Sequence, residues 1–304
     1  MDNVLIIGAG GREDALAWKA RQEARRVYVA PGNAGTYLLG RQYGNVENVL
    51  IPYDDRDGLA DFAQDAKIDL AIVGHENALA AGVVAEFQMR GIPVYGPQRL
   101  TAEIETKKAY AKLFMQRHGI PTVEPFYIVD SLAEAKRYAD QLYKEYDGAV
   151  IKVNGLARGK GVAVCASIAE IDDAIERINN DDDLRAAADK IVVERRIVGS
   201  NGGRPTEFSY IVWTDGENII PLILTRDFKY AFNGDRGPMS GGMAVYTRPN
   251  TPDGFEEYIM RNMAIPAVRG MAKEDRLFKG TLYLGIIEDG NDLLLSEFNA
   301  RYGD

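Results

Sequence analysis

The sequence has almost no cysteine and no long apolar run. Its one cysteine, Cys165, cannot form an internal disulfide, and it lies in an apolar, strand-like stretch. We therefore expect a buried, unreactive thiol and a reducing compartment, which favours a cytoplasmic location. No segment has the length of a membrane-spanning helix, and the first residues lack the basic start of a signal peptide. We expect no membrane partner.

An excess of positive charge is also missing. The 304 residues carry a formal net charge of -9, whereas binding to a nucleic acid requires a basic face. Nucleic acid is therefore not expected as a partner, although local clusters of Lys and Arg could still bind small anions. The length predicts two or three domains, and 46% apolar with 27% charged residues is typical of a globular protein.

A glycine turn follows the first apolar run. Val4 to Ile7 is typical of a buried strand, Gly8-Ala9-Gly10-Gly11 breaks it, and a helical pattern follows. Such a turn at a helix start binds anions well. Glu13 takes the place of the third glycine of a dinucleotide fingerprint, so a small phosphate is favoured over a dinucleotide. Glycines needed only for a tight turn are an equally good interpretation.

The first hundred residues alternate between strand and helix patterns. Strands are expected at 27–30, 69–73 and 93–95, with helices at 57–66 and from about 78 to 90. This alternation predicts a parallel, doubly wound sheet, whose ligands bind at the carboxyl ends of the strands. Glu76 lies at one such end and could bind a sugar hydroxyl, whereas His75 is more typical of a surface or capping role. A long helix is expected from about 100 to 117.

A basic glycine-rich loop joins two strands in the middle of the chain. The strands are expected at 149–153 and 162–166, and the loop 154–161 carries Gly159, Lys160 and Gly161 shortly after Lys152. This hairpin could close over a polyphosphate. It is not a Walker loop, because it lacks the Gly-Lys-Ser/Thr ending and runs into a strand. An idle hairpin is the less favoured interpretation.

The other expected elements are strands at 126–129, 191–194, 207–213, 219–224, 280–287 and 293–298 and helices at 131–146, 168–179 and 253–271. Residues 179–183 are interpreted as a solvated acidic loop. Residues 226–243 show little periodicity, and a long loop without secondary structure usually has a function.

The chain ends with a polar pair on a strand. Glu297 and Asn299 are two positions apart, so on a strand they point to one face, with Arg301 further along the same face. A carboxylate beside an amide oxygen can seat a magnesium ion that bridges phosphates. A strand end with exposed polar residues is the alternative for this segment alone.

Several separated segments together resemble one family. They are Gly10 to Glu13, Ala30 to Thr36, Leu79 to Gly82, Gly155 to Val162, Asp227 to Met243 and Glu297 to Asp304. In their order they resemble phosphoribosylamine-glycine ligase, also called glycinamide ribonucleotide synthetase, of the ATP-grasp superfamily. The resemblance implies an α/β fold: a Rossmann-like pre-ATP-grasp substrate-binding domain (1–100), a linking helix (101–121), an ATP-grasp lid (122–190) and a core with the metal-binding strand (191–304). Family members continue beyond this point with a further C-terminal subdomain.

The resemblance also implies an activity and its ligands. ATP, with Mg²⁺ or Mn²⁺, would drive the ligation of glycine to phosphoribosylamine through an acyl phosphate. Glu297 and Asn299 would hold the metal. The nucleotide would be bound by Lys108, Lys152, Gly159, Lys160, Gly161, Glu194, Ile197 and Glu207. The substrates would contact Gly10, Gly11, Arg12, Glu13, Asn33, Glu76, Asp227, Ser240 and Gly241, and Lys229, Asp235 and Arg301 would act in catalysis.

The substrate side of the chain departs from the family pattern. Asp14 replaces a usual His, His75 replaces a Pro, Phe228 replaces a His, and Met239 replaces an Asn. Three hypotheses follow: the family enzyme, as a shortened chain or with a second chain supplying the C-terminal subdomain; an ATP-grasp ligase for another amine and acid; or a nucleotide-binding protein without ligase activity.

Overall fold

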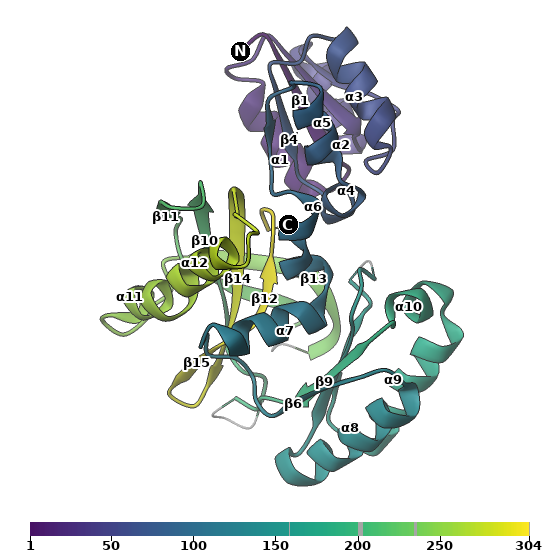
Figure 1. Cartoon of the computed structure of the whole chain (residues 1–304), viewed down its shortest axis with the longest axis vertical. Coiled ribbons are helices and arrows are strands. Elements are labelled where there is room, and N and C mark those ends of the chain that lie inside the picture. The colour runs from purple at the N-terminus through teal and green to yellow at the C-terminus, as the bar shows by residue number, and fades with distance from the viewer. Residues whose placement is uncertain (158, 200–202, 234–235, 304) are drawn as a thin grey trace.

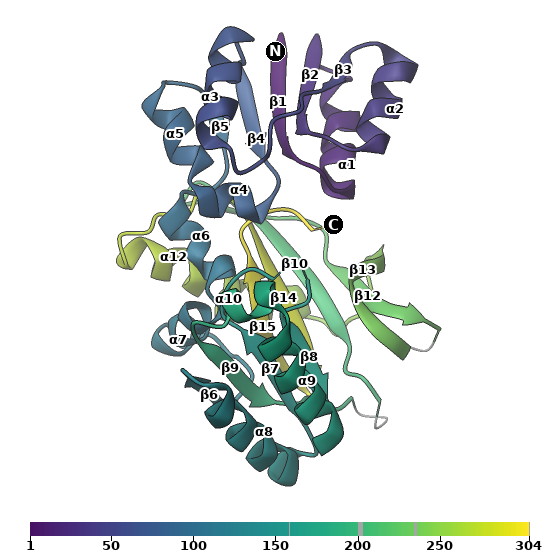
Figure 2. The same ribbon diagram turned by 90° about the vertical axis from the view of Figure 1, so that its right-hand side faces the viewer.

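The computed structural model describes residues 1–157, 159–199, 203–233 and 236–303. Their strands form three sheets (Figure 1). The first sheet, at the N-terminal end, stands apart from the other two, and the C-terminus lies close to the junction between them (Figure 2). Residues distant in sequence therefore meet at this junction.

The first sheet is parallel, as the alternation predicts, in the order β3-β2-β1-β4-β5. Its strands are β1 (Asn3–Gly8), β2 (Arg26–Pro31), β3 (Val46–Asn48), β4 (Leu70–Val73) and β5 (Val94–Tyr95). Its helices are α1 (Gly11–Ala20), α2 (Ala34–Tyr43), α3 (Arg56–Asp65), α4 (Glu76–Ala81) and α5 (Val83–Met89). The sequence patterns did not indicate α2 or β3, and the expected helix to residue 90 divides at Gly82, which has a left-handed φ of 87°.

The helix expected at 100–117 consists of two helices. They are α6 (Arg99–Thr106) and α7 (Lys108–Arg117). Lys107 between them has extended backbone angles. The break turns the chain, so that residues on both sides of Lys107 reach the same part of the molecule.

The second sheet has four strands in the order β6-β9-β7-β8 and is antiparallel. The strands are β6 (Phe126–Val129), β7 (Ala149–Val153), β8 (Val162–Cys165) and β9 (Ile191–Arg195). The helices α8 (Leu132–Tyr146), α9 (Ile168–Asn180) and α10 (Asp182–Ala187) accompany it. Thus β9 belongs to this sheet, although the expected lid boundary falls before it. Residues 179–183 are not a loop throughout, because Asp181 caps the start of α10.

The third sheet is antiparallel and has the order β13-β12-β10-β14-β15, with β11 beside β10. Its strands are β10 (Glu207–Thr214), β11 (Ile219–Pro221), β12 (Thr225–Phe232), β13 (Arg236–Thr247), β14 (Gly280–Asp289) and β15 (Asp292–Asn299). The segment interpreted as an irregular loop at 226–243 is therefore mostly two paired strands. The expected helix at 253–271 is α11 (Phe255–Ile259), a π-helical turn (Met260–Ala264) and α12 (Ile265–Lys273).

Of the three hydrophobic clusters among the described residues, two show how the sheets are held in place, and the third lies within the N-terminal unit. One core is continuous from Leu5 in β1 through Phe114 in α7 to Leu295 in β15. The second sheet has its own core, which includes Leu142, Ile151 and the buried Cys165. One core thus connects the first and third sheets by way of α6 and α7, and the second sheet has a core of its own. No helix among the described residues is long and apolar enough to cross a bilayer.

Candidate active site

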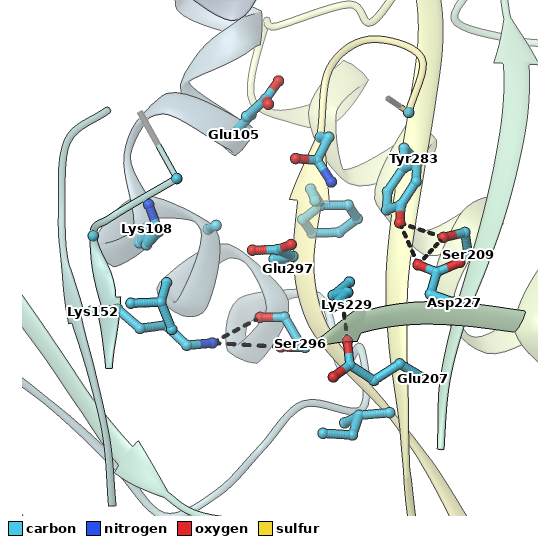
Figure 3. A pocket seen from close by; sticks show the side chains of 18 of the residues that line it. Glu105, Lys108, Lys152, Glu207, Ser209, Asp227, Lys229, Tyr283, Ser296 and Glu297 are labelled. Carbon is cyan, nitrogen blue, oxygen red and sulfur yellow. Dashed lines mark hydrogen bonds and ion pairs between the residues drawn. The ribbon is translucent and has the colours of Figure 1, made fainter. Parts of the chain in front are cut away.

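A cavity of about 860 Å³ lies where the three sheets meet. We call it the central cavity. Its lining residues come from α4, α6, α7, β7, β8, β9, β10, β12, β13, β14 and β15. Figure 3 labels several of them, among them Lys108, Lys152 and Glu297. The predicted site residues that line it are Glu76, Lys108, Lys152, Gly159, Gly161, Glu194, Ile197, Glu207, Asp227, Lys229, Glu297, Asn299 and Arg301. Residues predicted separately from distant segments therefore share one space.

Glu297 is the acidic centre of this cavity. Burial opposes ionisation of its carboxyl, but the positive charges of Lys229, Lys152, Lys108 and Arg301 outweigh that effect and hold its pKa below the ordinary value. Gly285 pairs with Glu297 across the ladder, and a Cβ there would lie 3.1 Å from the Glu297 side chain. The glycine leaves room for this carboxylate over β14.

Glu297 and Asn299 both line the central cavity, as their spacing on a strand predicts. A bulge lies close by, because Gly285 pairs with Glu297 whereas Ile286 pairs with Leu295. The carboxylate and the amide oxygen are hard oxygen donors that suit Mg²⁺ when phosphates supply further ligands. The described residues include no cluster of three or more His, Cys, Asp or Glu side chains able to hold a metal. The donor set therefore fits a metal bound together with a nucleotide.

Lys152 and Glu194 belong to a buried charge triad. Lys152 Nζ lies 2.5 Å from Glu194 Oε1, and Lys112 Nζ lies 2.6 Å from Glu194 Oε2. Burial lowers the pKa of Lys112 to about 8, against the attraction of Glu194. The two lysines carry one more positive charge than the single carboxylate cancels. The triad thus presents a net positive wall to the cavity.

Two further polar groups lie on the wall formed by β10 and β12. Lys229 Nζ is 2.5 Å from Glu207, and although burial opposes protonation, Glu207 and Glu297 raise the pKa of Lys229. Asp227 accepts a hydrogen bond from Tyr283 at 2.9 Å and another from Ser209 (Figure 3). This wall offers a fixed cation and a fixed carboxylate side by side.

Arg301 lies between two carboxylates from different parts of the chain. Its Nη2 is 3.0 Å from Glu105 Oε1, and its Nε is 3.3 Å from Glu76 Oε2. Burial raises the pKa of Glu105, whereas Arg301 helps to lower that of Glu76 against burial. Arg301 thus links α4, α6 and the segment after β15.

The glycine-rich loop between β7 and β8 contributes Gly159 and Gly161 to the cavity wall. Lys160 is exposed and is not among the residues that line the cavity. In this structure Lys160 is therefore not part of the cavity wall, and its phosphate contact stays a prediction. Arg158 lies outside the described residues.

A second, smaller cavity of about 280 Å³ adjoins the first. It is lined by Ala9, Gly10, Arg12, Glu13, Tyr53, His75 and Glu76, and the last three also line the central cavity. Glu13 is almost fully buried and accepts a hydrogen bond from the Gly10 N–H at 2.6 Å. That donor is therefore occupied by a carboxylate of the chain itself, which weakens the case for a phosphate at this turn.

The remaining predicted residues of the first sheet have structural contacts. Arg12 lies 3.5 Å from Glu13 Oε1 and also donates to the Gly74 carbonyl. Asn33 caps α2 by accepting from Thr36 N and donates to the Gly10 carbonyl at 2.8 Å. Gly11 begins α1 and does not line either cavity.

For three predicted residues the structure describes no side-chain surroundings. Asp235 lies outside the described residues, and for Ser240 and Gly241 only the course of β13 is described. The structure also adds residues that the sequence interpretation missed. Lys112 lies four positions after Lys108, the spacing of one helix face, and that signal could have indicated it. Glu105, Ser209 and Tyr283 carried no comparable pattern.

Family models and known proteins agree on what this chain resembles. The phosphoribosylglycinamide synthetase N domain matches residues 2–105, and the ATP-grasp (A) domain of the same family matches residues 106–304. Phosphoribosylamine-glycine ligase from Vibrio cholerae serotype O1 is 39% identical over 305 residues, covering 99% of this chain and 68% of the relative. The enzyme of that name from Yersinia pestis is 41% identical over 309 residues, with the same coverage.

Two solved structures are similar to this chain over almost its whole length. The crystal structure of phosphoribosylamine-glycine ligase from Thermotoga maritima superposes with a TM-score of 0.76 at 29% identity and covers 99% of this chain and 69% of that one. N5-carboxyaminoimidazole synthetase from Staphylococcus aureus, complexed with ADP, has a TM-score of 0.68 at 18% identity, covers 100% of this chain and 71% of that one, and shares the fold. With both domain models matched and about 40% identity across almost all its residues, the chain belongs to the phosphoribosylglycinamide synthetase family.

Proposed function

We propose that this chain carries out the ATP-dependent ligation of glycine to 5-phosphoribosylamine, giving glycinamide ribonucleotide, ADP and phosphate in cytoplasmic purine biosynthesis. The observation that carries the proposal is the Glu297 carboxylate, which lines the central cavity and is stabilised by Lys108, Lys152, Lys229 and Arg301. Membership of the family supports the same reaction, as do the relatives, which are phosphoribosylamine-glycine ligases.

The reaction needs two group transfers. The terminal phosphoryl group of ATP passes to the glycine carboxylate, and ADP leaves. The amine of phosphoribosylamine then attacks the acyl carbon and forms the C–N bond. The C–O bond to the phosphate breaks, phosphate leaves, and the amine loses a proton. Both steps require aligned reactants and stabilised negative charge more than a covalent nucleophile. A cavity rich in lysine and without a reactive cysteine suits that requirement.

We assign nucleotide binding to the wall formed by α7, β7 and β9. Lys108 and Lys152 would contact the phosphates, with Gly159 to Gly161 closing over them. Glu194 and Ile197 would border the adenine. Glu207 would reach the ribose only in competition with its 2.5 Å ion pair to Lys229.

We assign Mg²⁺, or Mn²⁺, to Glu297 and Asn299. The metal would neutralise charge on the transferred phosphoryl group. These two side chains hold oxygen donors on one wall of the cavity, and the neighbouring lysines keep Glu297 ionised.

We assign glycine to Asp227, Lys229 and Arg301, because a carboxylate pocket needs fixed cations and an ammonium group needs a fixed carboxylate. Phosphoribosylamine would occupy the small cavity beside Gly10, Arg12 and Glu76. The roles of Gly11, Glu13, Asn33, Asp235, Ser240 and Gly241 stay predictions from the resemblance.

The test is ADP release with all three substrates and with each omitted in turn. We expect release to require both glycine and phosphoribosylamine, with equal amounts of ADP and phosphate. ATP turnover that is independent of both substrates would contradict the proposal. The relatives are longer than this chain, which covers 68% of them. We propose that full activity needs the counterpart of their remaining third, and adding that piece as a second polypeptide should raise the rate.

A second candidate is a ligase of the same chemistry with a different amine. The His75 ring stacks on Tyr53, with centroids 4.1 Å apart and planes 9° from parallel, where both cavities meet. His75 is one of the departures from the family pattern. ADP release with glycine and another primary amine, exceeding that with phosphoribosylamine, would favour this candidate.

A further inference from the structure

Glu105 holds the end of the strand that carries the predicted metal ligands. Its side chain is buried at the end of α6 and lines the central cavity. Glu105 Oε2 accepts a hydrogen bond from the Ala300 N–H at 2.7 Å, and Oε1 lies 3.0 Å from Arg301 Nη2. Both oxygens thus bind consecutive residues directly after β15.

Those residues lie where the sheet ends. Asn299 still pairs with Tyr283 of β14, but Ala300 and Arg301 lie beyond the last strand pair of this ladder. The backbone after Asn299 therefore takes its position from contacts outside the sheet, and Glu105 supplies two of them. One restrains the backbone and the other restrains the guanidinium.

The break at Lys107 explains why α6 can reach this strand. Glu105 precedes the break and Lys108 follows it, and both side chains line the same cavity. Glu105 is therefore fixed on a helix while its oxygens face the end of β15. A buried carboxylate whose two oxygens are satisfied by one segment has a defined orientation.

We propose that Glu105 is a positioning residue for the metal site: it fixes Ala300 and Arg301, and so aims Asn299 and Glu297 into the central cavity. The inference rests on the proposed function in that it assumes a metal-nucleotide site at Glu297 and Asn299. It adds a residue that touches neither metal nor substrate. Outer partners of this kind typically change metal affinity by about 10- to 100-fold when removed.

The test is ADP binding by calorimetry to the full chain, with Mg²⁺ and with a chelator, in the absence of glycine and phosphoribosylamine. In Glu105→Leu we expect Mg-ADP affinity to fall on the order of 10- to 100-fold, with metal-free ADP affinity nearly unchanged. Glu105→Gln keeps an acceptor for the Ala300 N–H but loses the charge facing Arg301, so its loss should be smaller.

Glu103→Leu is the matched control. Glu103 is on the same helix and pairs with Arg276 at 2.6 Å, and it does not line the cavity. The proposal would be overturned if both Glu105 variants lost as much ADP affinity without Mg²⁺ as with it. It would also be overturned if Glu103→Leu lost as much Mg-ADP affinity as Glu105→Leu. Wild-type ADP binding that does not depend on Mg²⁺ would also overturn it. The calorimetry uses neither glycine nor phosphoribosylamine. A failure of the substrate test would therefore contradict the proposed function without contradicting the role of Glu105.

Discussion

The two adjoining cavities use charge in different ways. In the central cavity the cations Lys108, Lys152 and Lys229 come from separate elements and all lower the pKa of the Glu297 carboxyl, and two of them also pair with other carboxylates of the cavity wall. In the small cavity Arg12 and Glu13 lie 3.5 Å apart, and each bonds to the backbone: Glu13 accepts from the Gly10 N–H, and Arg12 donates to the Gly74 carbonyl. The charges of the central cavity thus surround a space for a ligand, whereas Arg12 and Glu13 also hold the backbone in place and so contribute to stability. The difference predicts that substitutions in the two cavities change different measurements.

Glu297→Ala should have the largest effect on ligand binding. A direct metal ligand should matter at least as much as the outer partners, which contribute about 10- to 100-fold. We therefore expect Mg-dependent ADP affinity to fall by more than about 100-fold while the unfolding temperature stays within a few degrees, measured by calorimetry and thermal denaturation. Asp292→Ala, at the exposed start of the same strand, is the control. Unchanged Mg-dependent affinity would remove the metal assignment.

Arg12→Leu should instead change stability. Removing one partner of a buried ion pair leaves Glu13 with an uncompensated charge, at a cost of about 3–5 kcal/mol in the free energy of unfolding. Urea denaturation measures this loss, and Arg25→Leu, at an exposed position, is the control. A folded variant that binds ADP as tightly as wild type would support a role of Arg12 in stability. A loss of ADP binding without any loss of stability would contradict that role.

The sequence alone indicated much of the central cavity and little of the contacts between its parts. The spacing of Glu297 and Asn299 predicted that they share one face because strand periodicity is local, and both line the central cavity, while their binding of a metal stays a prediction. The hairpin of β12 and β13 was missed because its glycine-rich sequence lacks a clear period, and pairing between strands supplies the structure. Glu105 was missed for a related reason, since its contacts with Ala300 and Arg301 join segments almost 200 residues apart.

In the small cavity the sequence indicated the local elements but not the contact between them. The glycine turn and α1 were recognised from the local pattern, but the pattern could not show that the Glu13 carboxylate would accept the Gly10 N–H. A Cβ at Gly8 or Gly74 would come within 2.4 Å of the Glu13 side chain. These glycines thus make room for a buried acid, which sequence spacing does not reveal.

Lys152→Met tests whether the triad wall binds phosphates. Charge-assisted hydrogen bonds contribute about 1.5–3 kcal/mol, so ATP affinity should fall on the order of 10- to 100-fold. Lys160→Ala should have a smaller effect, because Lys160 is exposed and outside the cavity lining. Titration of both variants with ATP measures the difference. An equal or larger loss in Lys160→Ala would show that the loop, and not the triad, provides the main phosphate contact.

The smallest expected effect is a pH dependence of the free energy of unfolding that comes from the buried triad. Burial lowers the pKa of Lys112 to about 8, from an ordinary value of 10.5. Between these values the unfolded chain binds more protons at this group than the folded chain, so its contribution makes stability rise with pH, by at most about 1.4 kcal/mol per pH unit. Below pH 8 this contribution is nearly constant, because Lys112 is protonated in both states.

Lys112→Met removes this titration, and urea denaturation from pH 7.5 to 9.5 measures the result. Burial also lowers the pKa of Lys108 and adds a slope of the same sign, so the difference between wild type and variant isolates Lys112. The free energy of unfolding of wild type should increase relative to that of Lys112→Met as the pH rises above 8. Lys107→Met, at a surface ion pair with Asp189, should follow the wild-type curve. Parallel curves for wild type and Lys112→Met would mean that Glu194 keeps Lys112 protonated throughout, and the triad would then be a fixed ionic wall at every pH of the titration.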